Sequence, residues 1–140
     1  PNAADVYMQL AGFYNRQGDF EKTIDALNQR TTLEPNNPEA FYTISTFFWD
    51  KAYRDFRITE QQKIDYANRG LAAADKAVAL NPSYMEAVTY RGLLLRVLAS
   101  VEKSADRQKA LLKDAEAMQA REALEMATLG GAPSNTSGAA

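Results

Sequence analysis

Apolar side chains recur along the chain at the spacing of one helix face. Tyr7, Leu10, Ala11 and Tyr14 follow the i, i+3, i+4, i+7 pattern of an amphipathic helix, and Gly18 stands where such a helix commonly ends. No segment shows the alternation of apolar and polar residues that is typical of strands joined by hairpin turns. Prolines separate the helical segments, because proline breaks the interior of a helix. The pattern therefore predicts an all-α fold.

Two related phrases mark boundaries between helical segments. Residues 34–41 read Glu-Pro-Asn-Asn-Pro-Glu-Ala-Phe, and residues 81–88 read Asn-Pro-Ser-Tyr-Met-Glu-Ala-Val. Each phrase closes one helix and opens the next. A short pair of helices cannot bury its own apolar face, so the repetition of such pairs predicts that they stack on one another.

Residues 4–37 resemble one unit of the tetratricopeptide repeat family, which is a helix–turn–helix of about 34 residues. The apolar residues of the first helix, the turn at 18–20 and the closing proline take the places that the family pattern expects. Two further units follow at 38–84 and 85–128, so the resemblance covers residues 4–128. It implies a right-handed α-solenoid of three stacked helical hairpins.

The second and third units are longer than the first, and their additional residues predict elongated hairpins. In the second unit, Thr59 and Gln62 have the spacing of a capping box. This box predicts a helix over 60–80, after a loop near 54–59. In the third unit, we expect a second loop and then a long helix over 105–128.

Three positions depart from the family pattern. Thr23 and Arg30 stand where small residues are usual, and Arg91 stands where a core apolar residue is usual. We expect Arg30 to keep its charged head group in water while its aliphatic stem packs against the core.

Composition and charge exclude several classes of function. The 140 residues carry 16 basic and 18 acidic side chains, a net charge of −2 that disfavours a partner nucleic acid. The chain has no cysteine and no histidine, so it lacks thiolate metal sites, the commonest general base and the usual zinc ligand. We therefore expect no enzyme activity, no metal and no cofactor. No apolar run approaches the length that a transmembrane helix needs.

The resemblance implies a concave surface lined by the first helix of each unit, where partner peptides of this family usually lie. Tyr42 and Trp49 are two helical turns apart on one stripe, and Tyr90 could face them from the next unit. An alternative places Trp49 in the core between hairpins. The candidate binding residues are Met8, Gly12, Asn15, Arg16, Tyr42, Thr46, Trp49, Tyr90, Leu93 and Arg96.

The sequence thus predicts a non-catalytic scaffold that binds a protein or peptide segment of unknown identity in its groove. A subfamily clamps the C-terminal carboxylate of chaperones with Lys, Asn and Arg, but here Met8, Gly12, Thr43, Glu86 and Tyr90 hold those places, which disfavours such a clamp. An aromatic groove suits a hydrophobic or amphipathic peptide.

Two other surfaces are open alternatives. The last helix lacks a capping repeat, so its apolar residues predict self-association, for example as a homodimer. These residues are Leu111, Leu112, Met118, Leu124 and Met126. The hairpin tips are a further candidate surface, with Phe56 and Ile58 as contacts.

The ends of the chain carry their own expectations. The sequence starts at Pro1 and not at Met, which indicates a mature or excised fragment. Cytoplasmic and bacterial periplasmic or exported locations therefore both stay open, the latter after removal of an N-terminal signal. Residues 129–140 are small and polar, and they predict a flexible tail or linker.

Overall fold

A computed structural model describes residues 2–139 of the chain, with the side chains of residues 2–129. Six helices follow one another within these residues: α1 (Ala3–Arg16), α2 (Phe20–Leu33), α3 (Pro38–Arg54), α4 (Glu60–Leu80), α5 (Met85–Val101) and α6 (Ala105–Ala139). No strand is present in this part of the chain, so the predicted all-α class is confirmed.

Polar side chains cap the first turns of α1, α2, α3 and α4. The Asp19 carboxylate accepts a hydrogen bond from the backbone N–H of Lys22 at 3.1 Å at the start of α2. At the start of α4, the Thr59 hydroxyl accepts from the Gln62 N–H at 3.0 Å, and the Gln62 side chain accepts from the Thr59 N–H at 2.8 Å. The predicted capping box is therefore confirmed, and α4 has the bounds that the box predicts.

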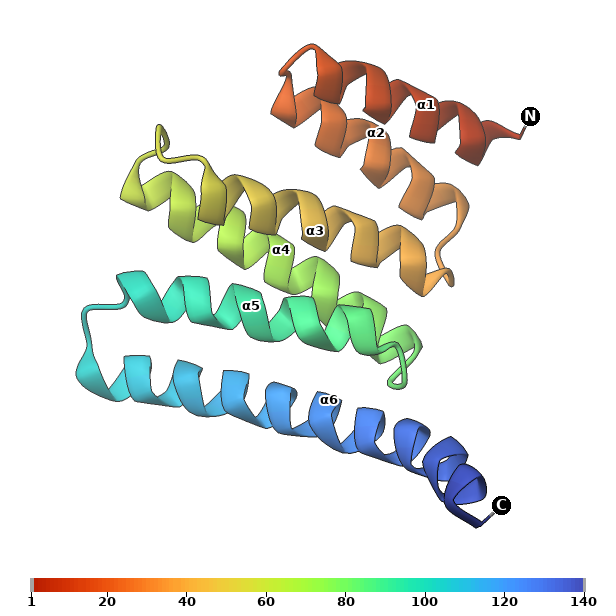
Figure 1. The fold of residues 1–140 in the computed structure, drawn as a ribbon. Coiled ribbons are helices and arrows are strands. Elements are labelled where there is room, and N and C mark those ends of the chain that lie inside the picture. Colours follow the sequence, from red (N-terminus) through yellow and green to blue (C-terminus); the bar gives the residue numbers. More distant parts are fainter. Residues whose placement is uncertain (1, 140) are drawn as a thin grey trace.

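The helices pair in chain order. α1 packs against α2, α3 against α4 and α5 against α6, and Figure 1 shows these three hairpins stacked one below another. Between hairpins, α2 packs on α3, α4 packs on α5, and α3 packs on α5. The first hairpin thus contacts the second through α2, while the second and third hairpins meet through three helices.

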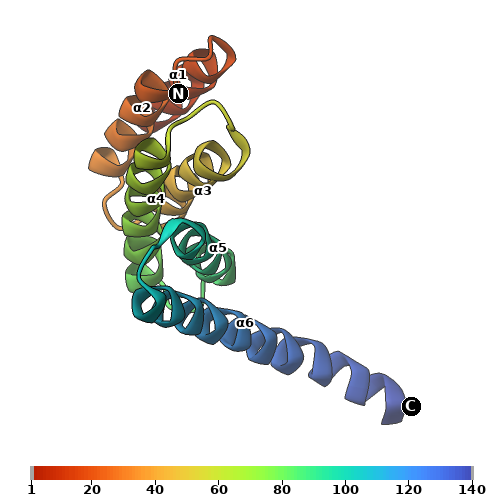
Figure 2. The same ribbon diagram turned by 90° about the vertical axis from the view of Figure 1, so that its left-hand side faces the viewer.

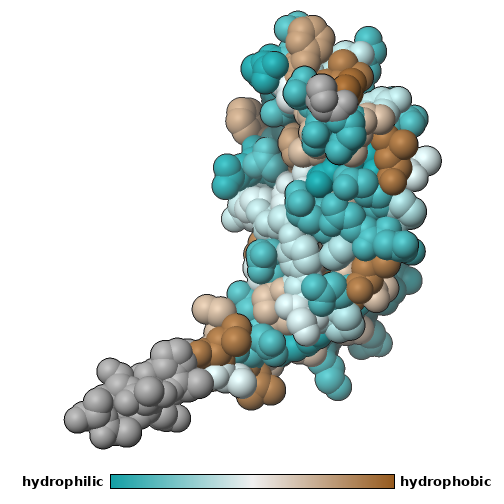
Figure 3. Space-filling model, turned by 90° about the vertical axis from the view of Figure 1, so that its right-hand side faces the viewer, coloured by the Kyte–Doolittle hydropathy of each residue, from teal (hydrophilic) through white to brown (hydrophobic). Residues whose placement is uncertain are grey.

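The stack is curved. In Figure 2, α1, α3 and α5 lie on the inner side of the curve, and α2 and α4 lie on the outer side. The end of α6 runs out beyond the other helices on the inner side. Figure 3 shows the corresponding hollow in the molecular outline, with apolar atoms gathered where α6 leaves the body.

Small residues allow the second and third hairpins to approach closely. Ala74 and Ala77 of α4 are fully buried, and so is Leu94 of α5. A Cβ atom at Gly70 would lie 2.8 Å from the Phe48 Cβ and 3.0 Å from a Leu94 methyl carbon. A larger residue at this position would therefore push α3 and α5 away from α4.

Two arginines hold neighbouring helices together. Arg30 of α2 is buried, and its guanidinium donates to Glu34 at 2.9 Å and to Glu39 of α3 at 3.2 Å. The expectation that this head group stays in water is therefore wrong, because carboxylates replace its hydration. Arg91 of α5 pairs with Asp75 of α4 and with Asp114 of α6, which explains a charge at a core position.

The third hairpin is longer than expected. The structure has α6 at Ala105–Ala139, whereas the sequence pattern predicts that this helix ends near residue 128. The expected tail at 129–140 lies almost entirely outside the residues whose side chains are described, so its flexibility stays a prediction.

Candidate functional site

Five aromatic rings form a continuous row on the inner side of the stack, which we call the aromatic row. The ring centroids of Tyr84 and Tyr42 are 5.3 Å apart, and those of Tyr42 and Tyr90 are 5.6 Å apart. Tyr90 then meets Trp49 at 5.6 Å, and Trp49 stacks on Tyr53 at 5.0 Å with the two ring planes 10° apart. The row joins two hairpins, because Tyr90 belongs to α5 and its two ring neighbours belong to α3.

Helical spacing explains why α3 contributes three of these rings. Trp49 follows Tyr42 by two turns and Tyr53 follows Trp49 by one turn, so all three side chains lie on one stripe of the helix. The packing of α3 on α5 then brings Tyr90 between Tyr42 and Trp49. Tyr84 joins the row from the residue that immediately precedes α5.

Trp49 stands between two hollows in the surface. One hollow of about 310 Å³ lies between α1, α3 and α5, and Asn15, Thr46, Phe47 and Tyr90 line it together with Trp49. The other hollow, of about 540 Å³, lies between α3, α4 and α5. Its lining comprises Trp49, Tyr53, Lys63, Leu93, Arg96, Val97 and Ser100. The second hollow is called the Trp49–Leu93 hollow below.

Burial raises the pKa of two phenols of the aromatic row. The pKa of Tyr42 is raised by desolvation first, and then by the neighbouring Tyr90 and Glu86. The pKa of Tyr84 is raised by desolvation and by the nearby Glu86 and Glu39 carboxylates.

Arg54 covers one edge of the row. Its guanidinium lies 5.5 Å from the Trp49 ring centroid and donates to Asp50 at 3.3 Å. Both charged side chains are largely exposed, so this pair forms a polar rim beside the indole.

The structure brings most of the sequence-predicted residues together. Tyr42, Trp49 and Tyr90 are in the aromatic row, Asn15 and Thr46 line the first hollow, and Leu93 and Arg96 line the second. The other α1 candidates, Met8, Gly12 and Arg16, line neither hollow. Met8 packs against the core between the first two hairpins, and the Arg16 guanidinium lies 3.4 Å from where a Gly12 Cβ would be.

Sequence reasoning missed several lining residues. Tyr53 lies on the same helical stripe as Tyr42 and Trp49, so extending that stripe by one turn could have found it. Phe47 could not be found this way, since it faces α1 from another side of α3. Lys63 comes from α4, on which the sequence analysis places no candidate.

The structure also answers whether Trp49 belongs to the core. Its side chain is half-buried and packs against the core cluster that contains Ala52, Ala67, Leu94 and Val97. The same side chain lines both hollows. Trp49 therefore has one surface in the core between hairpins and another in contact with solvent.

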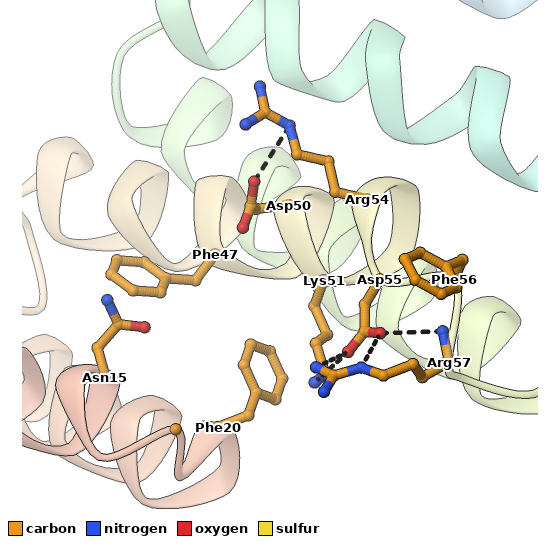
Figure 4. Close-up of a pocket in the computed structure, with 10 residues that line it drawn as sticks. Asn15, Phe20, Phe47, Asp50, Lys51, Arg54, Asp55, Phe56 and Arg57 are labelled. Carbon is orange, nitrogen blue, oxygen red and sulfur yellow. Dashed lines mark hydrogen bonds and ion pairs between the residues drawn. The ribbon is translucent and has the colours of Figure 1, made fainter.

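A separate cleft of about 550 Å³ lies between the α1–α2 turn and the end of α3 (Figure 4). Asp55 stands in its centre and accepts from Lys51 at 2.7 Å and from Arg57 at 3.0 Å. Hydrogen bonds from Arg57 and then from Lys51 hold the pKa of the Asp55 carboxyl well below its usual range. Because its central cations are paired internally, this cleft offers less unmatched charge than the Trp49–Leu93 hollow.

No known protein family matches the chain, and no curated protein sequence matches it. Within residues 2–139, no helix is long and apolar enough to cross a membrane. No three acidic side chains of the described part of the chain lie where they could share a metal ion.

Proposed function

We propose that the chain is a tetratricopeptide-like scaffold whose inner surface binds a peptide or protein segment. The three hairpins form a right-handed α-solenoid in this proposal, with the second and third elongated. Its support is the order of the helices: α1, α3 and α5 share the inner side of the curve, as expected for the first helices of successive repeats.

The aromatic row is the observation that carries the proposal. Trp, Tyr and Arg provide most of the binding energy at protein interfaces, because they bury a large area with few rotatable bonds. Here Tyr42, Tyr90 and Trp49 hold one another in place by edge-to-face contacts. A partner would therefore meet rings that are already ordered, with a hollow on each side of Trp49 for its side chains.

Selection from a library of random peptides, followed by alanine substitution, tests this function. Trp49→Ala lowers the affinity of selected peptides by about tenfold or more, as is typical of a central aromatic residue. Phe13→Ala is the matched control, because Phe13 is an exposed aromatic residue of α1 that lines neither hollow. Circular dichroism verifies that both variants fold. If the selected peptides bind Trp49→Ala and Phe13→Ala with equal affinity, the assignment of the groove as the binding surface is rejected.

Self-association through α6 is the second candidate function. Leu124, Met126 and Leu129 of α6 are exposed, which favours a contact between copies. However, side chains two residues apart, such as Leu124 and Met126, point to nearly opposite sides of a helix. These residues therefore do not form one continuous stripe. Light scattering over a concentration series measures the mass, and a constant monomer mass rejects self-association.

A further inference from the structure

The Trp49–Leu93 hollow combines apolar walls with unmatched positive charge. Trp49, Leu93 and Val97 supply apolar surface from α3 and α5. Val97 also belongs to the core cluster between these helices, and Trp49 packs against it. Lys63 and Arg96 stand at the same hollow, and no carboxylate lines it. The hollow is therefore positive even though the chain as a whole carries a net charge of −2.

The two cations of this hollow are not neutralised by neighbouring acids in the described part of the chain. Glu60 lies one turn before Lys63 on α4, but it pairs with Lys103 at 3.7 Å. Arg96 donates to the amide oxygen of Gln119 at 2.9 Å and forms no ion pair within the described residues, although Glu122 lines a neighbouring hollow with it. Asp50, the nearest acid along α3, pairs with Arg54 on the other side of Trp49.

We infer that this hollow selects a peptide segment in which an apolar side chain stands next to an acidic one. The inference rests on the proposed peptide-binding function and names the chemistry of the ligand. The apolar side chain packs against Trp49 and Leu93, and the neighbouring carboxylate pairs with Lys63 or Arg96. Charge complementarity of this kind contributes mainly to specificity and to the rate of association.

The positions of Lys63 and Arg96 allow a carboxylate at the opening of the hollow to approach either residue. Lys63 comes from α4, while Arg96 comes from α5, so the cations approach the hollow from different helices. Arg96 is exposed and Lys63 is half-buried. An ion pair between the carboxylate and either cation therefore leaves both charges partly in water. This arrangement avoids full desolvation of the charges, which would oppose binding.

Peptides that are blocked at both ends test the inference. Three peptides contain the same two leucines and differ only in the two residues between these leucines, which are both Asp, both Asn or both Lys. Trp49 is the only tryptophan of the chain, so its fluorescence and its indole N–H resonance report binding at either of the two hollows that it lines. The Asp peptide binds about five times more tightly than the Asn peptide, and the Lys peptide binds most weakly. Raising the salt concentration reduces this preference.

Two variants assign the preference to the cations. In Lys63→Gln/Arg96→Gln, the Asp and Asn peptides bind equally, while the affinity for the Asn peptide stays within about twofold of the unaltered chain. Lys109→Gln is the control, because Lys109 is an exposed residue of α6 that does not line the hollow. This control keeps the full preference for the Asp peptide.

Several results would overturn the inference. One is equal binding of the Asp and Asn peptides to the unaltered chain, and another is failure of the Asp peptide to perturb Trp49 at about 1 mM. A third is a preference for Asp that survives in the double variant. None of these results rejects the proposed function if library peptides still bind and still require Trp49. A fourth peptide has Asn residues between the leucines and a free C-terminus, and it shows whether a terminal carboxylate can replace the acidic side chain. If this fourth peptide binds more tightly than the Asp peptide, the inference is contradicted.

Discussion

The indole of Trp49 meets the phenol of Tyr90 edge to face, with their centroids 5.6 Å apart and their planes 84° apart, although the two residues belong to different hairpins. The candidate groove is therefore continuous with the packing between the second and third hairpins. A change that shifts α3 relative to α5 will alter both the stability of the stack and the shape of the groove.

The first prediction concerns Tyr90, whose ring contacts both Tyr42 and Trp49. Tyr90→Ala lowers the free energy of unfolding by about 2 kcal/mol, because it removes a half-buried ring and two aromatic contacts. It also exposes Trp49 to water and moves its fluorescence emission to longer wavelength. Tyr90→Phe is the control and retains both contacts. Urea unfolding measures the stability, and an equal loss in both variants would contradict the assigned role of the ring.

The second prediction concerns Gly70, where α3 and α5 both approach α4. Gly70→Ala places a methyl group 2.8 Å from the Phe48 Cβ, and neither helix can yield without repacking. We expect a loss of about 1–3 kcal/mol, even though alanine favours the helical backbone by about 1 kcal/mol.

Gly12→Ala is the matched control for Gly70→Ala. The nearest neighbour of its added methyl group is the flexible end of Arg16, at 3.4 Å. The gain in helix propensity therefore leaves the stability unchanged or slightly higher. Urea unfolding compares the two variants, and a stabilised Gly70→Ala protein would show that the helices are not packed as closely as described.

The helices were predictable because their determinants are local. Thr59 and Gln62 lie within one turn of each other, so the start of α4 could be placed from the sequence. The spacing of Tyr42 and Trp49 likewise predicts a shared stripe on α3, and the structure has it. Residues on one helix keep this relationship whatever the remainder of the chain does.

Relationships between helices were less predictable. The inclusion of Lys63 in the hollow depends on how α4 packs beside α3 and α5, and no local pattern encodes that geometry. The burial of Arg30 depends on Glu39, which belongs to the next hairpin. Met8 was expected at the groove, but it packs against the core cluster shared by the first two hairpins and lines neither hollow.

The third prediction concerns Arg30. Its guanidinium is buried between Glu34 and Glu39, and one of its terminal nitrogen atoms, Nη1, has no partner within the described residues. Arg30→Met keeps the aliphatic stem and removes an imperfectly paired charge, so the free energy of unfolding changes by less than about 1 kcal/mol. Arg30→Ala also removes the stem and costs about 2 kcal/mol.

The contrast between these two variants separates packing from charge. Urea unfolding of both proteins at neutral pH gives the two free energies. A loss in Arg30→Met nearly as large as that in Arg30→Ala would show that the ion pairs to Glu34 and Glu39 stabilise the junction of α2 and α3 more than the stem does.

The last prediction concerns pH and Asp55. Its pKa is held well below the usual value, principally by the hydrogen bond from Arg57 and then by that from Lys51. A depressed pKa in the folded state means that the ionised carboxylate stabilises the fold at pH values above the ordinary aspartate pKa of about 4. This stabilisation is lost progressively as the pH falls below that value.

Asp55→Asn therefore lowers the melting temperature at neutral pH, and the difference from the unaltered chain shrinks as the pH falls from 5 towards 2. Asp25→Asn, at an exposed aspartate without an ion pair in the described residues, is the control and shows no such convergence. A difference between Asp55→Asn and the unaltered chain that stays constant over this range would mean that the loop depends on the shape of Asp55 and not on its charge.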